Sequence, residues 1–364
     1  MHTQIPTGST SKWPSAMMFA GMVIFFRERL NSETLLLIKH TNQQIQDGTI
    51  ESLDDPLGKY LSWWTKNESD LRSTVTMRML LSFTSGFGGG HPGEEMNTRQ
   101  AREWRARNSP VQNVYLDACD ATSGDVVECA KSIYENVKLI GTPGKVYSYN
   151  SNHLQIAAAL AVEVSGLKIH DFIDKYLFKP FNMTESYYYG EGCPDFGGDL
   201  VTTGADYEKF LHGILSYKPL SQDLVDESEK DYTPFLDYYY TLYGDYGFGH
   251  FLLCFDSYNG FTKECKDARV HMDPGAFGFI PYIDRKNGYY LEVVAAETTP
   301  TGSYPLSGIP EYLAVALKPH VDAILSDNPP DSDAHLHYTP SLFSLGLADV
   351  NYCLDCKLYP DHCT

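Results

Sequence analysis

Gly8-Ser9-Thr10-Ser11-Lys12, followed by a mostly apolar run, is the stretch that decides how this chain is interpreted. On a helix, positions i and i+3 lie on one face, so the amine of Lys12 can reach the hydroxyl of Ser9. If burial or nearby cations depress the pKa of that amine, it can accept the serine proton and make the hydroxyl a nucleophile. A helix N-terminus also supplies N–H groups where an oxyanion would form. The pattern therefore indicates nucleophilic catalysis by Ser9.

The Ser-x-x-Lys spacing alone is not specific. Ser165-Gly166-Leu167-Lys168 repeats it, and Gly166 there indicates the C-cap of a helix. The interpretation therefore depends on four further stretches that follow the first in order: LDDPLGKYL at 53–61, MRMLLSFTSG at 77–86, PGKVYSYNSN at 143–152 and GGDLVTTGADY at 197–207.

Taken together, these stretches resemble the penicillin-recognising serine hydrolases, which include class C β-lactamases, D-alanyl-D-alanine peptidases and related esterases. The resemblance runs from about residue 8 to about residue 320. It implies an α/β (α+β) fold of the β-lactamase/transpeptidase type, with an antiparallel sheet flanked by helices and a helical lobe. The expected activity is hydrolysis of an ester or small amide through an acyl-enzyme.

The resemblance also implies the catalytic roles. Ser9 is the expected nucleophile, Lys12 activates it, and Tyr149 shares the base duty and protonates the leaving group. A tyrosine with a pKa near ~10 is protonated at neutral pH, so Tyr149 needs a cation such as Lys12 beside it. The expected oxyanion hole combines the Ser9 N–H with one from the strand of the third family motif.

Two motifs depart from the family pattern. Ser151 stands where the family has the asparagine of Tyr-x-Asn, and His271-Met272-Asp273 stands where it has Lys-Thr-Gly or His-x-Gly. We expect Ser151, His271, Asp273 and Gly275 to contact substrate, although His271 can also be interpreted as a surface histidine. The negative charge of Asp273 disfavours substrates that carry a carboxylate, such as β-lactams and D-Ala-D-Ala peptides.

Composition narrows the classes of function. The chain has 364 residues, 43% of them hydrophobic, and a net charge of −19. That charge argues against nucleic-acid partners and anionic membranes. The apolar run at 16–26 is too short to span a bilayer. We expect a small-molecule ester or amide as the partner, with no cofactor and no metal, and the oligomeric state stays open. The alternative is a non-catalytic or defective truncated relative that uses its groove for binding.

Eight cysteines favour an oxidising compartment. Short loops predict the disulfides Cys119–Cys129 and Cys254–Cys265, and the partner of Cys193 is left open. The tail cysteines suit disulfides better than zinc, which His362 beside them would also allow: Cys353, Cys356 and Cys363. Asn67 and Asn182 begin glycosylation sequons. We expect a secreted or otherwise extracytoplasmic protein, although no signal peptide is visible.

The expected organisation is a hydrolase domain at 1–325 and a Pro/Asp/Cys-rich tail at 326–364. Only eight residues precede Ser9, so we expect the N-terminal strands and any signal peptide of the family to be missing. Residues 24–44 interrupt the helix that begins at Lys12. We interpret them as a translated intron or gene-model error, with a genuine variable loop as the alternative.

Periodicity and composition predict the remaining elements. Helices are expected at 153–164, ended by Gly166, at 169–176, closed before Pro180, and at 309–325. Strands are expected at 246–255, 276–283 and 289–296, the last two joined by a turn at 284–288.

Overall fold

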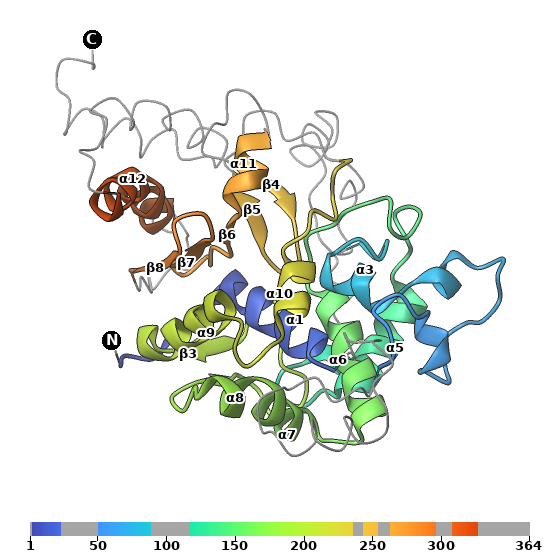
Figure 1. The fold of residues 1–364 in the computed structure, drawn as a ribbon. Coiled ribbons are helices and arrows are strands. Elements are labelled where there is room, and N and C mark those ends of the chain that lie inside the picture. The colour runs from blue at the N-terminus through green and yellow to red at the C-terminus, as the bar shows by residue number, and fades with distance from the viewer. Residues whose placement is uncertain are drawn as a thin grey trace, which may run out of the picture. The chain divides into compact units, whose positions relative to one another are not determined.

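The computed structural model describes residues 2–22, 50–88, 117–235, 243–253, 263–295 and 308–326 (Figure 1). They belong to two compact units. The first holds Met1–Asp237 and Tyr246–His250, and the second holds Tyr238–Asp245 and Phe251–Thr364. The atypical segment at 24–44, and the tail after Ser326, lie outside the described residues.

Helix α6 (Asn152–Ser165) is the centre of the first unit. Its alanine-rich sequence presents small apolar side chains, and its residues from 152 to 161 are all buried. Gly166 ends it in the left-handed conformation at φ 67°, as the sequence predicted. The helices that pack against α6 include α1 (Lys12–Ala20), α3 (Met77–Leu81) and α5 (Val126–Asn136).

Proline does not end the next helix, contrary to the prediction. The chain continues from α7 (Ile169–Ile173) through the π-helical turn η5 (Asp174–Phe178) into α8 (Lys179–Phe181). Pro180 lies at the start of α8, directly after the π-helical turn η5. Asn182, at φ 57°, ends the helix instead.

A small antiparallel sheet holds the chain just before Ser9. Its order is β1-β3-β2, with β1 (Ile5–Pro6), β2 (Tyr187–Tyr188) and β3 (Leu200–Thr202). Ile5 pairs with Thr202 and Pro6 with Val201. The other elements of this unit are η1 (Gly8–Ser11), η2 (Leu57–Lys59), η3 (Leu71–Thr74), η4 (Asp117–Cys119), α9 (Gly204–Ser216) and α10 (Gln222–Ser228).

The second unit contains a five-stranded sheet in the order β4-β5-β6-β7-β8. The pairs from β5 to β8 are antiparallel. Its elements are β4 (Tyr243–Tyr246), β5 (Phe251–Leu253), α11 (Lys263–Ala268), β6 (Val270–Met272), β7 (Phe279–Asp284), β8 (Tyr289–Val294) and α12 (Gly308–Leu325). The antiparallel sheet and the helices confirm the predicted mixed α/β class.

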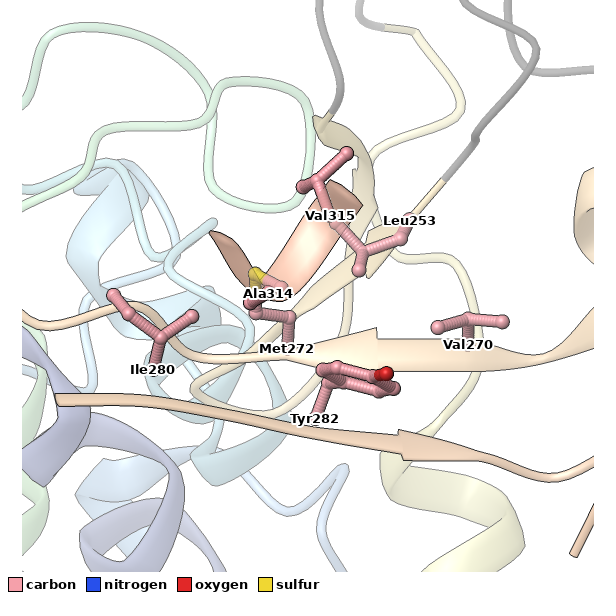
Figure 2. Packing of buried hydrophobic residues seen from close by; sticks show 7 residues of the cluster. All are labelled: Leu253, Val270, Met272, Ile280, Tyr282, Ala314 and Val315. Carbon is pink, nitrogen blue, oxygen red and sulfur yellow. The ribbon is translucent and has the colours of Figure 1, made fainter. Parts of the chain in front are cut away.

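Sheet and helix of this unit share one apolar core (Figure 2). Ala314 and Val315 of α12 pack with five strand residues: Leu253, Val270, Met272, Ile280 and Tyr282. The β7–β8 hairpin and α12 lie within a few residues of their predicted positions. The predicted strand at 246–255 is wrong as one element, because residues 247–250 separate β4 from β5 and Gly249 has a φ of +72°.

The disulfide Cys119–Cys129 is present as predicted, at an S–S distance of 2.01 Å. Cys265 is also disulfide-bonded, and its predicted partner Cys254 lies outside the described residues, as do the tail cysteines. Cys193 is buried as a free thiol.

Two further searches cover only the described residues. None of their helices is long and apolar enough to cross a bilayer. No group of three or more His, Cys, Asp or Glu side chains among them could hold a metal ion.

Candidate active site

Ser9 and Lys12 lie together at the start of the first long helix. Ser9 sits in the 3-10 turn η1, which continues directly into α1, and Lys12 is the first residue of α1. Lys12 is only 4% exposed. Its Nζ donates to Ser9 Oγ at 3.1 Å and to the carbonyl oxygen of Gly197 at 2.6 Å. The i, i+3 spacing therefore places the Lys12 amine within hydrogen-bond distance of the Ser9 hydroxyl.

The neighbouring hydroxyl of Ser11 has a different role. Ser11 is fully buried, and its Oγ donates to the carbonyl of Gly8 at 2.7 Å. The same Oγ accepts the N–H of Leu200 at 3.0 Å. Ser11 thus ties the η1 turn to β3 and leaves half-buried Ser9 as the reactive candidate.

Tyr149 is the third member of the site. Its ring centroid lies 4.7 Å from Lys12 Nζ, and 37% of the residue is exposed. Its ring also lies 5.9 Å from the ring of Phe83 and 6.1 Å from that of Tyr246. The structure therefore brings the three predicted catalytic side chains together and places the Lys12 amine over the tyrosine ring.

His153, which sequence analysis missed, supports the segment that carries Tyr149. It is fully buried and stacks on Phe83 at 4.9 Å. Its Nε2 lies 2.8 Å from the Ser148 carbonyl and its Nδ1 lies 2.8 Å from Ser85 Oγ. Burial lowers the pKa of His153 to about 4, so the ring is neutral at pH 7. These partners assign Nε2–H as donor to Ser148 and Nδ1 as acceptor from Ser85. The signal was a histidine at the start of a mostly apolar helix.

Ser151, not Asn152, is the second-motif residue that lies beside this site. A Cβ placed on Gly197 would come within 2.4 Å of Ser151 Oγ, so the serine packs directly on the glycine whose carbonyl binds Lys12. Asn152 instead donates to the Gly88 carbonyl at 2.6 Å. Asn150 donates to Ser148 Oγ at 2.9 Å. Both asparagines hold the surrounding loops.

Gly197 belongs to the segment 193–199, whose place in the site sequence analysis did not find. A backbone carbonyl carries no side-chain signal, so only the folded chain reveals it. Asp195 Oδ1 accepts the Gly197 N–H at 2.8 Å, and Asp199 Oδ2 accepts the Asp195 N–H at 2.8 Å. Burial, reinforced by the charge of Asp195, raises the pKa of Asp199 to about 6.

Asp199 should make stability depend on pH. Its folded-state pKa of about 6 lies above the ordinary 3.8. The protonated side chain therefore contributes fully to the free energy of unfolding below pH 4, and this contribution is lost as the pH rises through 6. We expect Asp199→Asn to be more stable than the native chain by on the order of 1 to 2 kcal/mol at pH 7, allowing for partial exposure. The advantage should shrink toward zero at pH 4. Urea unfolding at several pH values measures it.

The exposed neighbour Glu191 offers a matched control. Glu191→Gln should leave the pH dependence of stability unchanged. If Asp199→Asn and the native chain lost stability in parallel between pH 4 and 6, Asp199 would not be the titrating group.

The third-motif residues belong to the second unit. His271 lies on β6, paired with Leu252 and Ile283, and is fully buried, so its interpretation as a surface histidine is wrong. Asp273 is also fully buried, and Gly275 donates its N–H to the Phe279 carbonyl at 2.8 Å. Their contacts with substrate stay predictions.

Comparison with known proteins agrees with the family resemblance found in the sequence. The sequence model of the Beta-lactamase family matches residues 41–236, a range that begins after Ser9 and Lys12. A comparison with curated proteins finds no match.

Solved structures share the fold at low sequence identity. The octameric penicillin-binding protein homologue from Pyrococcus abyssi is 16% identical, with a TM-score of 0.57 over 94% of this chain and 70% of that one. The penicillin-binding protein from Bacillus halodurans is 15% identical, with a TM-score of 0.54 over 86% and 87%. EstCE1, a hydrolase with promiscuous acyltransferase activity, is 14% identical, with a TM-score of 0.57 over 85% and 83%.

Proposed function

Because the chain belongs to the β-lactamase family, we propose that it is a serine hydrolase that cleaves an ester or small amide through an acyl-enzyme on Ser9. The observation that carries the proposal is the contact of 3.1 Å between Lys12 Nζ and Ser9 Oγ, in a chain segment outside the matched range. A buried amine on a serine hydroxyl is the arrangement that activates such a nucleophile.

The proposed first step is attack on the substrate carbonyl. Lys12, as a neutral amine, accepts the proton of Ser9 as Oγ forms a bond to the carbonyl carbon. The carbonyl π electrons move to its oxygen, and the N–H of Ser9 in the first helical turn is the proposed stabiliser of that oxyanion.

The proposed second step releases the leaving group. The oxyanion re-forms the carbonyl, the bond to the leaving group breaks, and the proton returns to the leaving group from Lys12 directly or through the Tyr149 phenol. Water then attacks the acyl-enzyme in the same way and restores Ser9. The preference for an ester or small amide rests on Asp273, a carboxylate where the family has glycine.

Covalent labelling tests the nucleophile. A fluorophosphonate probe should attach to the native protein, and peptide mapping should place the adduct on Ser9. Ser9→Ala should abolish labelling, because no other serine has a buried amine on it among the hydroxyl contacts described. Ser165→Ala, in the second Ser-x-x-Lys, is the matched control and should label normally. Labelling that survives Ser9→Ala would refute the assignment.

A further inference from the structure

The Gly197 carbonyl can act on Lys12 only if the segment 193–199 holds it in place. Within this segment, the Asp195 carbonyl accepts the N–H groups of Gly198 and Asp199 at 3.0 and 2.8 Å. Together with the bond from Gly197 N to Asp195 Oδ1, these make a tight turn with Gly197 inside it. The direction of the Gly197 carbonyl is therefore set by where this turn is anchored.

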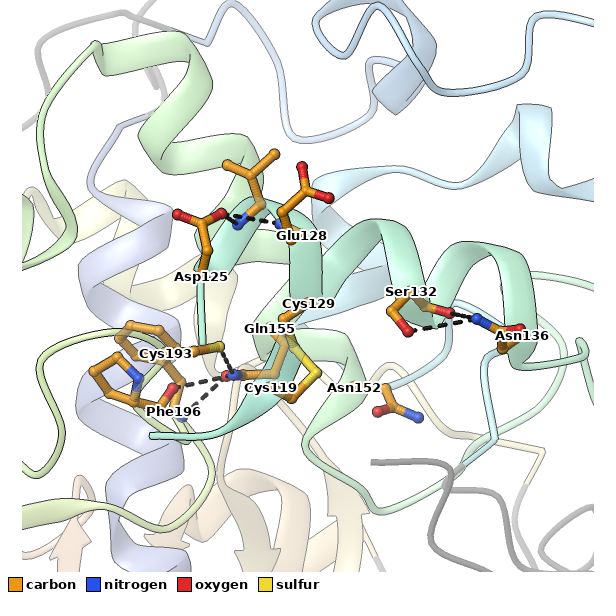
Figure 3. The surroundings of a disulfide bond; sticks show 12 residues. Cys119, Asp125, Glu128, Cys129, Ser132, Asn136, Asn152, Gln155, Cys193 and Phe196 are labelled. Carbon is orange, nitrogen blue, oxygen red and sulfur yellow. Dashed lines mark hydrogen bonds between the residues drawn. A yellow bond between two sulfur atoms is a disulfide. The ribbon is translucent and has the colours of Figure 1, made fainter. Parts of the chain in front are cut away.

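Gln155 of α6 is one anchor of the turn (Figure 3). Its Nε2 donates to the Pro194 carbonyl at 3.0 Å and to Cys193 Sγ at 3.3 Å. Its Oε1 accepts the Phe196 N–H at 3.1 Å. Both ends of one amide thus bind the backbone on the two residues that flank Asp195.

The position of Gln155 is unusual for a polar side chain. It is 3% exposed, and Leu154, Ile156 and Ala157 beside it on α6 are fully buried. Burial of an amide is unfavourable unless its groups are paired, and every bond described for this one goes to the segment 193–199. An apolar residue would suit the helix as well. The bonds from Gln155 to the segment 193–199 therefore account for a polar side chain at this buried position.

We propose that Gln155 is a positioning residue that keeps the Gly197 carbonyl on Lys12 and so controls the charge and direction of the amine at Ser9. This inference rests on the proposed function of Ser9. A carbonyl acceptor fixes one N–H direction of Lys12 in the neutral amine as well as in the ammonium form, and it also stabilises the ammonium form. Loss of the fixed direction is what slows attack by Ser9, because loss of the acceptor by itself favours the neutral amine that accepts the serine proton. With that direction fixed, the remaining directions include Ser9 Oγ.

Other groups also hold the segment 193–199 or lie near Lys12, and the test must distinguish their effects from that of Gln155. Ser15 of α1 donates to the Phe196 carbonyl at 2.8 Å, so the segment keeps a second anchor when Gln155 is replaced. The ring centroid of Tyr149 lies 4.7 Å from Lys12 Nζ, and the carboxylates of Asp195 and Asp199 accept backbone N–H groups within the turn. The variants below leave all of them in place.

The test compares two variants with the native chain. Gln155→Met keeps the length of the side chain and removes all its polar bonds, whereas Gln155→Glu keeps an acceptor for Phe196 N and loses both donors. We expect the rate of fluorophosphonate labelling of Ser9 to fall about 10- to 100-fold in Gln155→Met and less in Gln155→Glu, measured well below the melting temperature. Ser221→Ala removes the N-cap of α10, away from the turn, and serves as a control of reduced stability.

A second readout does not require catalysis. Lysine side chains labelled with ¹⁵N at Nζ give the titration midpoint of Lys12, assigned with Lys12→Arg. Because the ammonium loses an acceptor, the midpoint should move to lower pH in Gln155→Met by about half a unit or more and stay unchanged in Ser221→Ala.

The outcomes separate the two hypotheses. If the native protein does not label at Ser9 but the Lys12 midpoint moves in Gln155→Met, the hydrolase proposal fails and the positioning role stands. If Ser9 labels and both the rate and the midpoint match the native values in Gln155→Met, the positioning role is refuted. A lower melting temperature with neither change, as in Ser221→Ala, also refutes it, because that is the behaviour of a purely structural residue.

Discussion

Replacing Lys12 with methionine is expected to slow acylation of Ser9 by about a thousandfold or more, equivalent to about 4 kcal/mol of transition-state stabilisation. Methionine fills much of the same buried space but cannot accept the Ser9 proton. The native amine lies 3.1 Å from that hydroxyl and Lys12 as a whole is 4% exposed, so solvent cannot easily replace the amine. The second-order rate of fluorophosphonate labelling measures the loss.

Lys168 provides the matched control, because it occupies the same place in the second Ser-x-x-Lys but is exposed. Lys168→Met should label at the native rate. A Lys12→Met variant that folds and labels at more than a tenth of the native rate would exclude Lys12 as the base and shift that role to Tyr149.

Gly249→Ala is expected to have the largest effect on stability, a loss of about 2 to 4 kcal/mol. Gly249 has a φ of +72°, and a Cβ there would lie 2.4 Å from the carbonyl oxygen of Lys12 and 2.8 Å from the Cβ of Ala16. The substitution adds the strain of a left-handed residue, about 1 kcal/mol, to overpacking against the α1 backbone, about 1 to 3 kcal/mol. Because the clash is with Lys12 itself, labelling of Ser9 should also slow.

Gly166→Ala separates strain from the clash. Gly166 has nearly the same φ, +67°, and a Cβ there meets nothing within 4 Å. It should cost only about 1 kcal/mol in urea unfolding and leave labelling unchanged. Equal destabilisation by the two substitutions would mean that Gly249 is required only for its backbone conformation.

Several features were predictable because their causes are local. The i, i+3 spacing places Lys12 on Ser9 in any helical turn, and Gly166 ends α6 because glycine tolerates a left-handed residue. The β7–β8 hairpin follows from β-branched and aromatic runs on either side of the turn at 284–288. The break between β4 and β5 at Gly249 was harder to predict. The close approach to α1 requires glycine there, and no local sequence pattern indicates that contact.

What the sequence alone determined is therefore the contact between Ser9 and Lys12, the family and the mixed α/β class, since these depend on residue types at short spacings and in a fixed order. The tertiary structure decided which groups complete the site. Lys12 and Gly197 are 185 residues apart, and the acceptor is a backbone carbonyl, which leaves no side-chain signal in the sequence. Gln155 and His153 gained their roles only when α6 was buried, because a buried polar side chain must bond whatever backbone the fold brings to it.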